Sequence, residues 1–182
     1  MINPNLIDDR RKEAITELQK ILKPFIENLG NLSRIEAYDI SHLSGNQAAG
    51  AMVVSENGYL KPGEYRHFNI KYSQSDSDTA MVNEVIARRL NRGDWSKPDL
   101  ILLDGGIPQL SSVMAIKSVN LPPFISLAKQ FETIIIPVNG AFKEIKLQKD
   151  NPGLQLLMHL RDEAHRFCRR LHHHRRAKII FT

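Results

Sequence analysis

The sequence predicts a mixed α/β fold: a sheet of three antiparallel strands, followed by alternating helices and strands, with helices flanking the sheet. Two observations lead to this prediction. The first part of the chain contains three short runs typical of strands, and the short connections between them imply antiparallel neighbours. Further on, the run DLILL at 99–103 is typical of a strand buried on both faces, and helical patterns lie on either side of it.

A helix is predicted over residues 6–29, because apolar residues recur there near helical spacing. Pro24 is expected to end or kink this helix, since proline lacks the N–H that an α-helix needs. The pair Gly30-Asn31 closes the segment. Residues 1–33 are therefore interpreted as a helical lead-in to a domain over 34–178, with 179–182 as a tail.

Three strands are predicted next, at 34–41, 48–55 and 64–70. Turn residues punctuate this region, namely Ser44-Gly45-Asn46, Asn57-Gly58 and then Pro62-Gly63. The polar residues 73–79 lead into a helix that Asp78 or Thr79 can cap. The apolar stripe of this helix is formed by Met81, Val85, Ile86 and Leu90.

The second half of the chain alternates between helix and strand. A helix is predicted over 109–119, a strand at 124–128, and a hairpin of 132–136 with 142–147 over the Asn139-Gly140 turn. Asn151-Pro152 is a typical helix start, with a cap followed by proline at the first helical position. The core stripe of this final long helix comprises Leu154, Leu157, Ala164, Cys168 and Leu171.

Composition excludes several classes of protein. Hydrophobic residues make up 42% of the 182 residues and charged residues 25%, which argues against disorder. The single cysteine, Cys168, excludes an internal disulfide and a cysteine zinc site, and it fits a reducing, cytoplasmic compartment. No apolar run approaches the roughly 18 residues of a membrane span. Walker, GxGxxG, HExxH and GxSxG motifs are absent, which argues against nucleotide-dependent, protease and esterase chemistry.

Positive charge is concentrated near the end of the chain. The segment 161–178 holds seven basic residues against two acidic ones, which accounts for the formal net charge of +5. A basic cluster beside a balanced body suggests a polyanion such as nucleic acid, whereas the alternative is a solvated terminal helix. The basic residues are Arg161, Arg166, Arg169, Arg170, Arg175, Arg176 and Lys178.

Two aspartates stand out as candidates for chemistry. Asp39 lies inside an apolar strand, where an acid is costly unless it is paired or bound to a metal. Asp104 ends a buried strand and precedes Gly105-Gly106, a position where open α/β sheets place ligand sites. On adjacent strands, the two acids would make a site for a hard divalent cation such as Mg²⁺. The alternative for Asp104 is a helix cap or an ordinary turn acid.

His165 is the third candidate. It lies at the edge of the core stripe of the final helix, with Asp162 and Arg161 on the same face. Such a histidine can complete a metal site or act as a general acid or base near neutral pH. The alternative is a partly buried histidine paired with Asp162.

Four blocks, in this order, together resemble the UvrC family: RIEAYDISH at 34–42, PDLILLDGG at 98–106, SLAK at 126–129 and RDEAHRF at 161–167. UvrC is the incision subunit of the bacterial UvrABC nucleotide excision repair nuclease. The resemblance covers about residues 10–178 and points to the C-terminal endonuclease domain of the family. It implies an RNase H-like fold and a cut 5′ to a lesion in damaged double-stranded DNA.

The resemblance also implies roles for individual residues. Asp39, Asp104 and His165 match the catalytic triad of the family, and the two aspartates would hold Mg²⁺ or Mn²⁺. Asp78 resembles a further catalytic acid before the next helix, although Asp76 lies only two residues away. Contacts to DNA are expected from Lys129, Arg161, Arg166, Arg169 and Arg170. For Lys129 and Arg161 the alternative is ion pairing within the protein.

The sequence departs from the family in two respects. Ile107-Pro108 stands where the family usually has a lysine soon after its DGG, which puts one phosphate contact or packing role in doubt. The GIY-YIG nuclease, the UvrB-binding region and the helix-hairpin-helix motifs of the family are not found in these residues, so docking on a UvrB–DNA complex is an open expectation. The expected function is metal-dependent DNA incision. The alternative is a catalytically silent remnant that binds DNA or serves as a repair scaffold.

Overall fold

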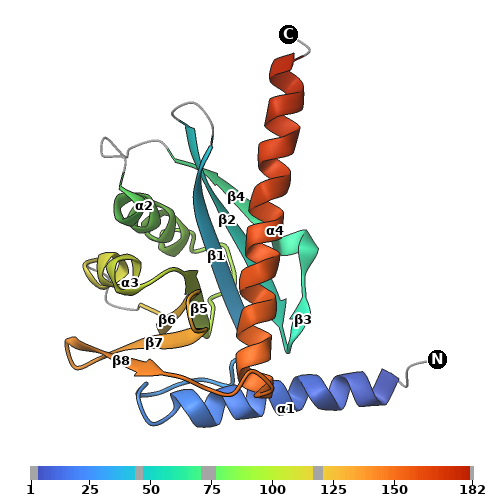
Figure 1. The fold of residues 1–182 in the computed structure, drawn as a ribbon, viewed down its shortest axis with the longest axis vertical. Coiled ribbons are helices and arrows are strands. Elements are labelled where there is room, and N and C mark those ends of the chain that lie inside the picture. The colour runs from blue at the N-terminus through green and yellow to red at the C-terminus, as the bar shows by residue number, and fades with distance from the viewer. Residues whose placement is uncertain (1–3, 44–46, 71–76, 117–120, 181–182) are drawn as a thin grey trace.

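A computed structural model describes residues 4–43, 47–70, 77–116 and 121–180 (Figure 1). Its helices are α1 (Pro4–Leu22), α2 (Asp78–Leu90), α3 (Ile107–Met114) and α4 (Pro152–Ile180), with a short 3₁₀ turn, η1 (Pro62–Glu64). The strands are β1 (Arg34–Leu43), β2 (Gln47–Glu56), β3 (Tyr59–Leu60), β4 (Arg66–Asn69), β5 (Leu100–Asp104), β6 (Phe124–Ala128), β7 (Thr133–Val138) and β8 (Ala141–Ile145).

The strands form one mixed sheet in the order β3-β2-β1-β5-β6-β7-β8, with β4 also paired to β2. Strand β5 runs parallel to β1 and to β6, and the other described pairs are antiparallel. The predicted fold class is therefore confirmed: three antiparallel strands (β1, β2 and β4) come first, and helices alternate with strands after them. The parallel centre is the part of this topology that matters for the site.

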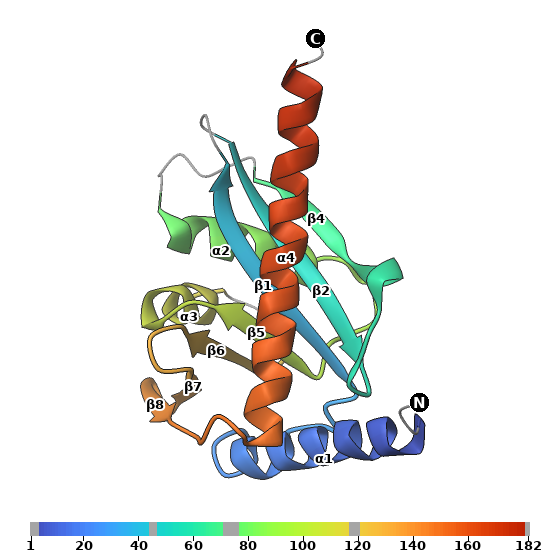
Figure 2. The same ribbon diagram turned by 45° about the vertical axis from the view of Figure 1, so that its right-hand side comes forward.

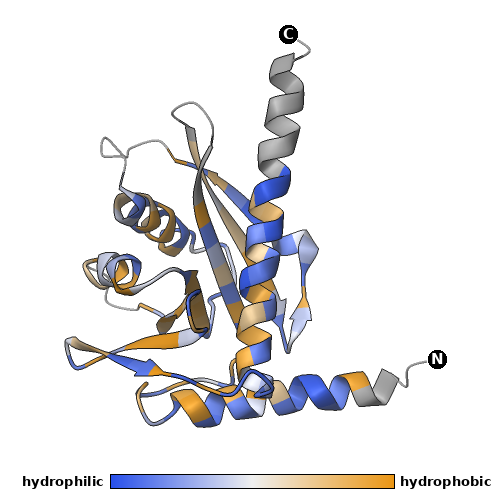
Figure 3. Cartoon of the chain, viewed as in Figure 1, coloured by the Kyte–Doolittle hydropathy of each residue, from blue (hydrophilic) through white to orange (hydrophobic). Residues whose placement is uncertain are grey.

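Helices cover both faces of the sheet (Figures 1 and 2). Helix α4 crosses β1 and β2 on one face and packs on α1 near its own beginning, whereas α2 and α3 pack together on the other. Each face of the sheet has its own apolar core. Leu102 and Leu157 belong to the core on the α4 side, and Leu103 and Val85 belong to the core on the α2 side. Figure 3 shows this apolar material concentrated on the strands and on α2 and α3.

The first helix is shorter than predicted, because α1 ends at Leu22 rather than at residue 29. Pro24 is the physical reason, since within a helix its ring clashes with the carbonyl four residues earlier and it has no N–H to donate. Turns follow, in which the N–H groups of Phe25 and Ile26 both donate to the Leu22 carbonyl. Leu18 and Leu22 are fully buried, so α1 shares a core with the sheet.

Two helix starts also differ from the prediction. Helix α2 is capped by Ser77, whose hydroxyl accepts from the Ala80 N–H at 3.3 Å, so neither Asp78 nor Thr79 is the cap. Helix α3 begins at Ile107 and ends at Met114, instead of covering 109–119, because Pro108 fits the first turn of a helix. Residues 117–120 lie outside the described part of the chain, as do the predicted turn at 44–46 and residues 71–76.

The remaining elements follow the prediction closely. The strand predicted at 64–70 is shorter in the structure, since η1 occupies 62–64 and β4 begins at Arg66. Asn151 caps α4 as expected, accepting from the Leu154 N–H at 3.0 Å. The stripe of α4 is buried at Leu154, Leu157, Ala164 and Cys168, whereas the side chain of Leu171 lies outside the described residues.

Candidate functional site

The parallel pairing of β1 and β5 brings the two aspartates together. The register runs from Ile35 beside Leu100 to Tyr38 beside Leu103, and its continuation by one residue sets Asp39 beside Asp104. Because side chains alternate along a strand, residues at the same register position project from the same face. The two aspartates therefore share one face, although 64 residues separate them in the sequence.

Helix α4 brings His165 to the same place. Its Nδ1 lies 3.1 Å from Oδ2 of Asp39, in a contact between residues 126 positions apart. One ligand atom from each of Asp39, Asp104 and His165 lies within 4.8 Å of the others. The pairing of His165 with Asp162 that the sequence allowed is not what the structure shows, because Asp162 accepts from Arg161 instead.

Asp39 and Asp104 border a pocket of about 390 Å³ at the carboxyl end of β5. Asp78, in the first turn of α2, lines the same pocket and is exposed, whereas Asp76 lies outside the described residues. The full lining comprises Tyr38, Asp39, Ile40, Asp78, Val82, Leu103, Asp104, Gly105, Gly106, Gln109, Ala128, Lys129 and Gln130. The pocket thus joins three carboxylates from three elements with one lysine.

The surroundings of Asp104 suit a bound cation. Its Oδ2 lies 2.9 Å from the ammonium of Lys129, while its buried Oδ1 has no hydrogen-bond partner among the described residues. A buried carboxylate oxygen without a partner is costly, and a bound cation would satisfy it. Two carboxylates beside an open pocket suit Mg²⁺ or Mn²⁺, which take oxygen ligands and leave room for water.

Gly105 shapes the turn that follows Asp104. Its φ of 151° falls in a region that other residues rarely adopt, and a Cβ there would lie 2.9 Å from Cδ of Gln109. The Gln109 side chain fills that space and accepts from the Gly106 N–H at 3.1 Å. The glycine turn and its glutamine therefore fix the wall of the pocket next to the carboxylate.

The carboxylates of Asp39 and Asp104 lie close enough to repel each other. Burial raises the pKa of Asp39, and the nearby carboxylate of Asp104 raises this pKa further, while His165 and Lys129 oppose the effect. A raised pKa means that the folded state holds the Asp39 proton more tightly than the unfolded state does. The contribution of Asp39 to stability is therefore present at low pH and is lost as the pH rises through the raised pKa.

Asp39→Asn is accordingly expected to stabilise the metal-free protein at neutral pH, because it removes a buried charge beside another carboxylate. The gain is on the order of 1 kcal/mol, or about 2–4 °C in melting temperature for a chain of this size. Thermal unfolding in EDTA measures it. Asp150→Asn, at an exposed carboxyl before α4, should change nothing. A lower melting temperature for Asp39→Asn at pH 7 would contradict the assigned repulsion.

The predicted DNA-contacting residues have different surroundings. Arg161 is 8% exposed and pairs with Glu132 and Asp162, which is the ion-pairing role that the sequence left open. Arg166 is exposed and makes two hydrogen bonds to Glu163, of 2.5 and 2.6 Å. Arg169 and Arg170 are exposed, and Arg169 lies one helical turn beyond His165. The side chains of Arg175, Arg176 and Lys178 lie outside the described residues.

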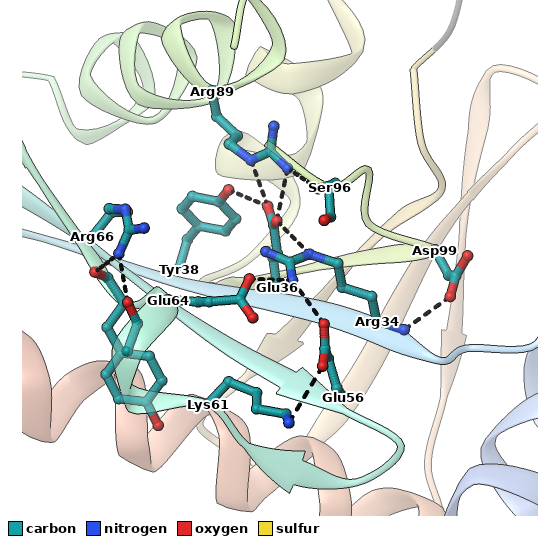
Figure 4. A network of polar contacts seen from close by, with 12 residues as sticks. Arg34, Glu36, Tyr38, Glu56, Lys61, Glu64, Arg66, Arg89, Ser96 and Asp99 are labelled. Carbon is teal, nitrogen blue, oxygen red and sulfur yellow. Dashed lines mark hydrogen bonds and ion pairs between the residues drawn. The ribbon is translucent and has the colours of Figure 1, made fainter. Parts of the chain in front are cut away.

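Sequence analysis missed a buried polar network beside the pocket (Figure 4). Glu36 is fully buried and accepts hydrogen bonds from Arg34, Arg89 and Tyr38. Burial and the Glu36 carboxylate raise the pKa of Tyr38, so its hydroxyl stays protonated and donates. The signal was present in the strand, because Arg34 and Glu36 alternate with apolar residues that face the other side.

Comparison with known proteins relates the chain to one family. The profile of the UvrC RNAse H endonuclease domain matches residues 26–168. The UvrABC system protein C of Methanococcoides burtonii is 44% identical over 150 residues, which cover 80% of this chain and 25% of that protein. That of Dictyoglomus thermophilum is 42% identical over 173 residues, covering 92% and 28%. The chain spans only about a quarter of the length of these curated relatives.

A search of solved structures finds endonuclease V proteins. The match to the crystal structure of endonuclease V from Streptomyces avermitilis covers 88% of this chain and 92% of that chain, with a TM-score of 0.46 and 12% identity.

In the described part of the chain, no helix combines the length and the apolar character needed to cross a membrane.

Proposed function

Because the chain belongs to the UvrC RNase H endonuclease domain family, we propose that it is a divalent-metal-dependent endonuclease that cuts damaged duplex DNA on the 5′ side of a lesion. One observation carries this proposal: Asp39, Asp104 and His165, far apart in the sequence, place ligand atoms within 4.8 Å of one another beside an open pocket. In this reading the chain acts in nucleotide excision repair, in the cytoplasm.

Asp39 and Asp104 would hold Mg²⁺ or Mn²⁺, and the Oδ1 of Asp104, which has no hydrogen-bond partner among the described residues, supports this assignment. When bound, the metal would polarise the scissile phosphate and lower the pKa of a water. Asp78 also lines the pocket, where its carboxylate would bind a water of the metal. We assign it a supporting role in the same site.

The other polar residues handle protons and phosphate. His165 is half exposed, and its Nδ1 contacts Asp39, which leaves Nε2 for a water or for the leaving oxygen. The Lys129 side chain is 65% exposed, so its ammonium can shift from Asp104 to a phosphate oxygen. Arg166, Arg169 and Arg170 extend the basic surface along α4 and would contact the DNA backbone. Arg161 would contact DNA while it keeps its ion pairs with Glu132 and Asp162.

The test is incision of a lesion-bearing duplex that already carries a nick on the 3′ side of the lesion. With Mn²⁺ or Mg²⁺, the purified chain should cut on the 5′ side, and EDTA should abolish the cut. Millimolar Mn²⁺ should also raise its melting temperature, because a ligand that binds only the folded state stabilises it. A UvrB–DNA complex, the proposed partner of the whole protein, is the second substrate to supply. Salt-sensitive DNA binding without any cut on either substrate would favour the silent remnant instead.

A further inference from the structure

The Glu36 network joins two walls of the pocket. Both carboxylate oxygens of Glu36 receive donors from Arg89, with Nε to Oε2 at 2.9 Å and Nη2 to Oε1 at 2.8 Å. Oε2 also accepts from the Tyr38 hydroxyl at 2.8 Å, and Arg34 donates to Oε1 at 3.2 Å. Glu36, Tyr38 and Arg34 belong to β1, while Arg89 comes from the last turn of α2 (Figure 4).

Tyr38 and Arg89 connect Glu36 to the pocket. Tyr38 lines it directly and precedes Asp39 in the strand. Arg89 lies on the same helix as Val82 and Asp78, which line the pocket about two and about three turns away. Arg89 also donates a hydrogen bond from Nη2 to the Ser96 carbonyl at 2.6 Å, which links this end of α2 to the loop before β5.

The same network reaches the origin of the β1–β5 register. The Arg34 N–H donates to the Asp99 carboxylate at 2.8 Å, and the Asp99 N–H donates back to the Arg34 carbonyl at 2.8 Å. This reciprocal contact joins the two strands at their beginnings, five residues before Asp39 on β1 and five before Asp104 on β5. A slip of one residue would turn one aspartate to the opposite face of the sheet.

We propose that Arg89 is a positioning residue: through its two hydrogen bonds to Glu36, it fixes α2 against β1 and so holds Asp78 and the pocket wall in place around Asp39 and Asp104. The inference rests on the proposed function, because it assigns Arg89 a part in shaping the same cation site. Arg89 acts only through other residues and contacts none of the reacting atoms.

A contribution to folding stability does not by itself explain why this buried network is present. Buried ion pairs contribute little net stability, since the cost of desolvation offsets the attraction. Helix α2 already packs on the sheet through Met81, Val82, Val85 and Ile86, all of which are buried. The two hydrogen bonds from Arg89 to Glu36 add a defined orientation of the helix to this apolar contact. The reason is that the planar guanidinium of arginine matches a carboxylate in one arrangement.

Arg89→Lys tests the proposal, because it keeps the charge and loses the planar guanidinium. The Mn²⁺ concentration at half-maximal thermal stabilisation should rise about 10-fold, the lower end of the effect of losing a residue that orients metal ligands. Arg92→Lys is the matched control, since Arg92 also makes two hydrogen bonds to one carboxylate, that of Asp94 at the surface. Its midpoint should stay within about twofold of the original. Equal midpoints for Arg89→Lys and the unmodified chain would overturn the proposal.

A triple variant separates positioning from stability. Glu36→Leu, Arg89→Met and Tyr38→Phe together remove Glu36 and two of its three donors, while Arg34 keeps its ion pairs with Glu56 and Glu64. The melting temperature should therefore stay within a few degrees of the original. The Mn²⁺ midpoint should nonetheless remain about 10-fold raised. A triple variant with normal stability and a normal midpoint would show that the network is only structural.

Amide hydrogen exchange decides the case without a metal. In the metal-free Arg89→Lys variant, exchange should quicken about 10-fold at residues 82–85, at the pocket end of α2, whereas Arg92→Lys should leave this segment unchanged. If Mn²⁺ fails to stabilise the unmodified chain, the proposed function fails, and the exchange result still judges the positioning role. Faster exchange confined to residues 88–90 would refute that role.

Discussion

Asp104→Asn should reduce DNA cutting by at least about 10³-fold, a loss of roughly 4 kcal/mol of transition-state stabilisation. Asparagine keeps the shape of the side chain and removes the negative charge that would hold the cation. Oδ1 of Asp104, which lacks a hydrogen-bond partner in the part of the chain that the structure describes, is the atom whose ligand role is lost. Asp39→Asn should have an effect of similar size, because its carboxylate faces the same space.

The measurement is the single-turnover rate of the 5′ cut on the pre-nicked duplex, at saturating enzyme and Mn²⁺. Circular dichroism and DNA binding at low salt should be unchanged in both variants, which separates lost chemistry from lost folding. Asp94→Asn is the control, since Asp94 pairs with Arg92 at the surface and does not line the pocket. Cutting by Asp104→Asn within about tenfold of the original rate would rule out the proposed metal site.

His165→Ala has the second largest expected effect, a loss of about 10²-fold or more in the cutting rate. The imidazole contacts Asp39 at 3.1 Å and also opens to solvent, an arrangement suited to moving a proton or orienting a water. Its side chain is 48% exposed, so its removal leaves no cavity and should change the melting temperature by only a degree or two.

The same single-turnover assay measures this loss. His159→Ala is a matched control on the same helix, because His159 is exposed and lines a different pocket, beside α1. The control should cut at the original rate. If His165→Ala cuts as fast as His159→Ala, the histidine has no part in the chemistry and only supports the fold.

Local sequence predicted most of the elements, because their signals are local. The buried strand 100–104, the hairpin over Asn139-Gly140 and the Asn151 cap of α4 all depend on side chains within a few residues of one another. The errors were also local in origin. The apolar spacing after Leu22 continued past a proline that ended the helix, and three capping residues in a row, 77–79, left the start of α2 ambiguous.

The candidate site was foreseeable only in part. An acid within an apolar strand and an acid before two glycines each marked an unusual position, and four ordered motifs supplied the resemblance to UvrC. The pairing of Arg161 with Glu132 was not foreseeable in detail, because it joins α4 to the turn between β6 and β7. The contact of Arg89 with Glu36 spans 53 residues and leaves no periodic trace in the sequence.

The sequence by itself determined the α/β class, the family and the identity of the acids and the histidine, because residue type and local order carry that information. Only the tertiary structure decided that Asp39, Asp104 and His165 meet on one face of the sheet. It also decided that one oxygen of Asp104 has no partner among the described residues and that Lys129 contacts the other oxygen. The physical reason is that these relations follow from the parallel register of β1 with β5 and from the path of α4 across them. Both are set by packing between segments that the chain order leaves far apart.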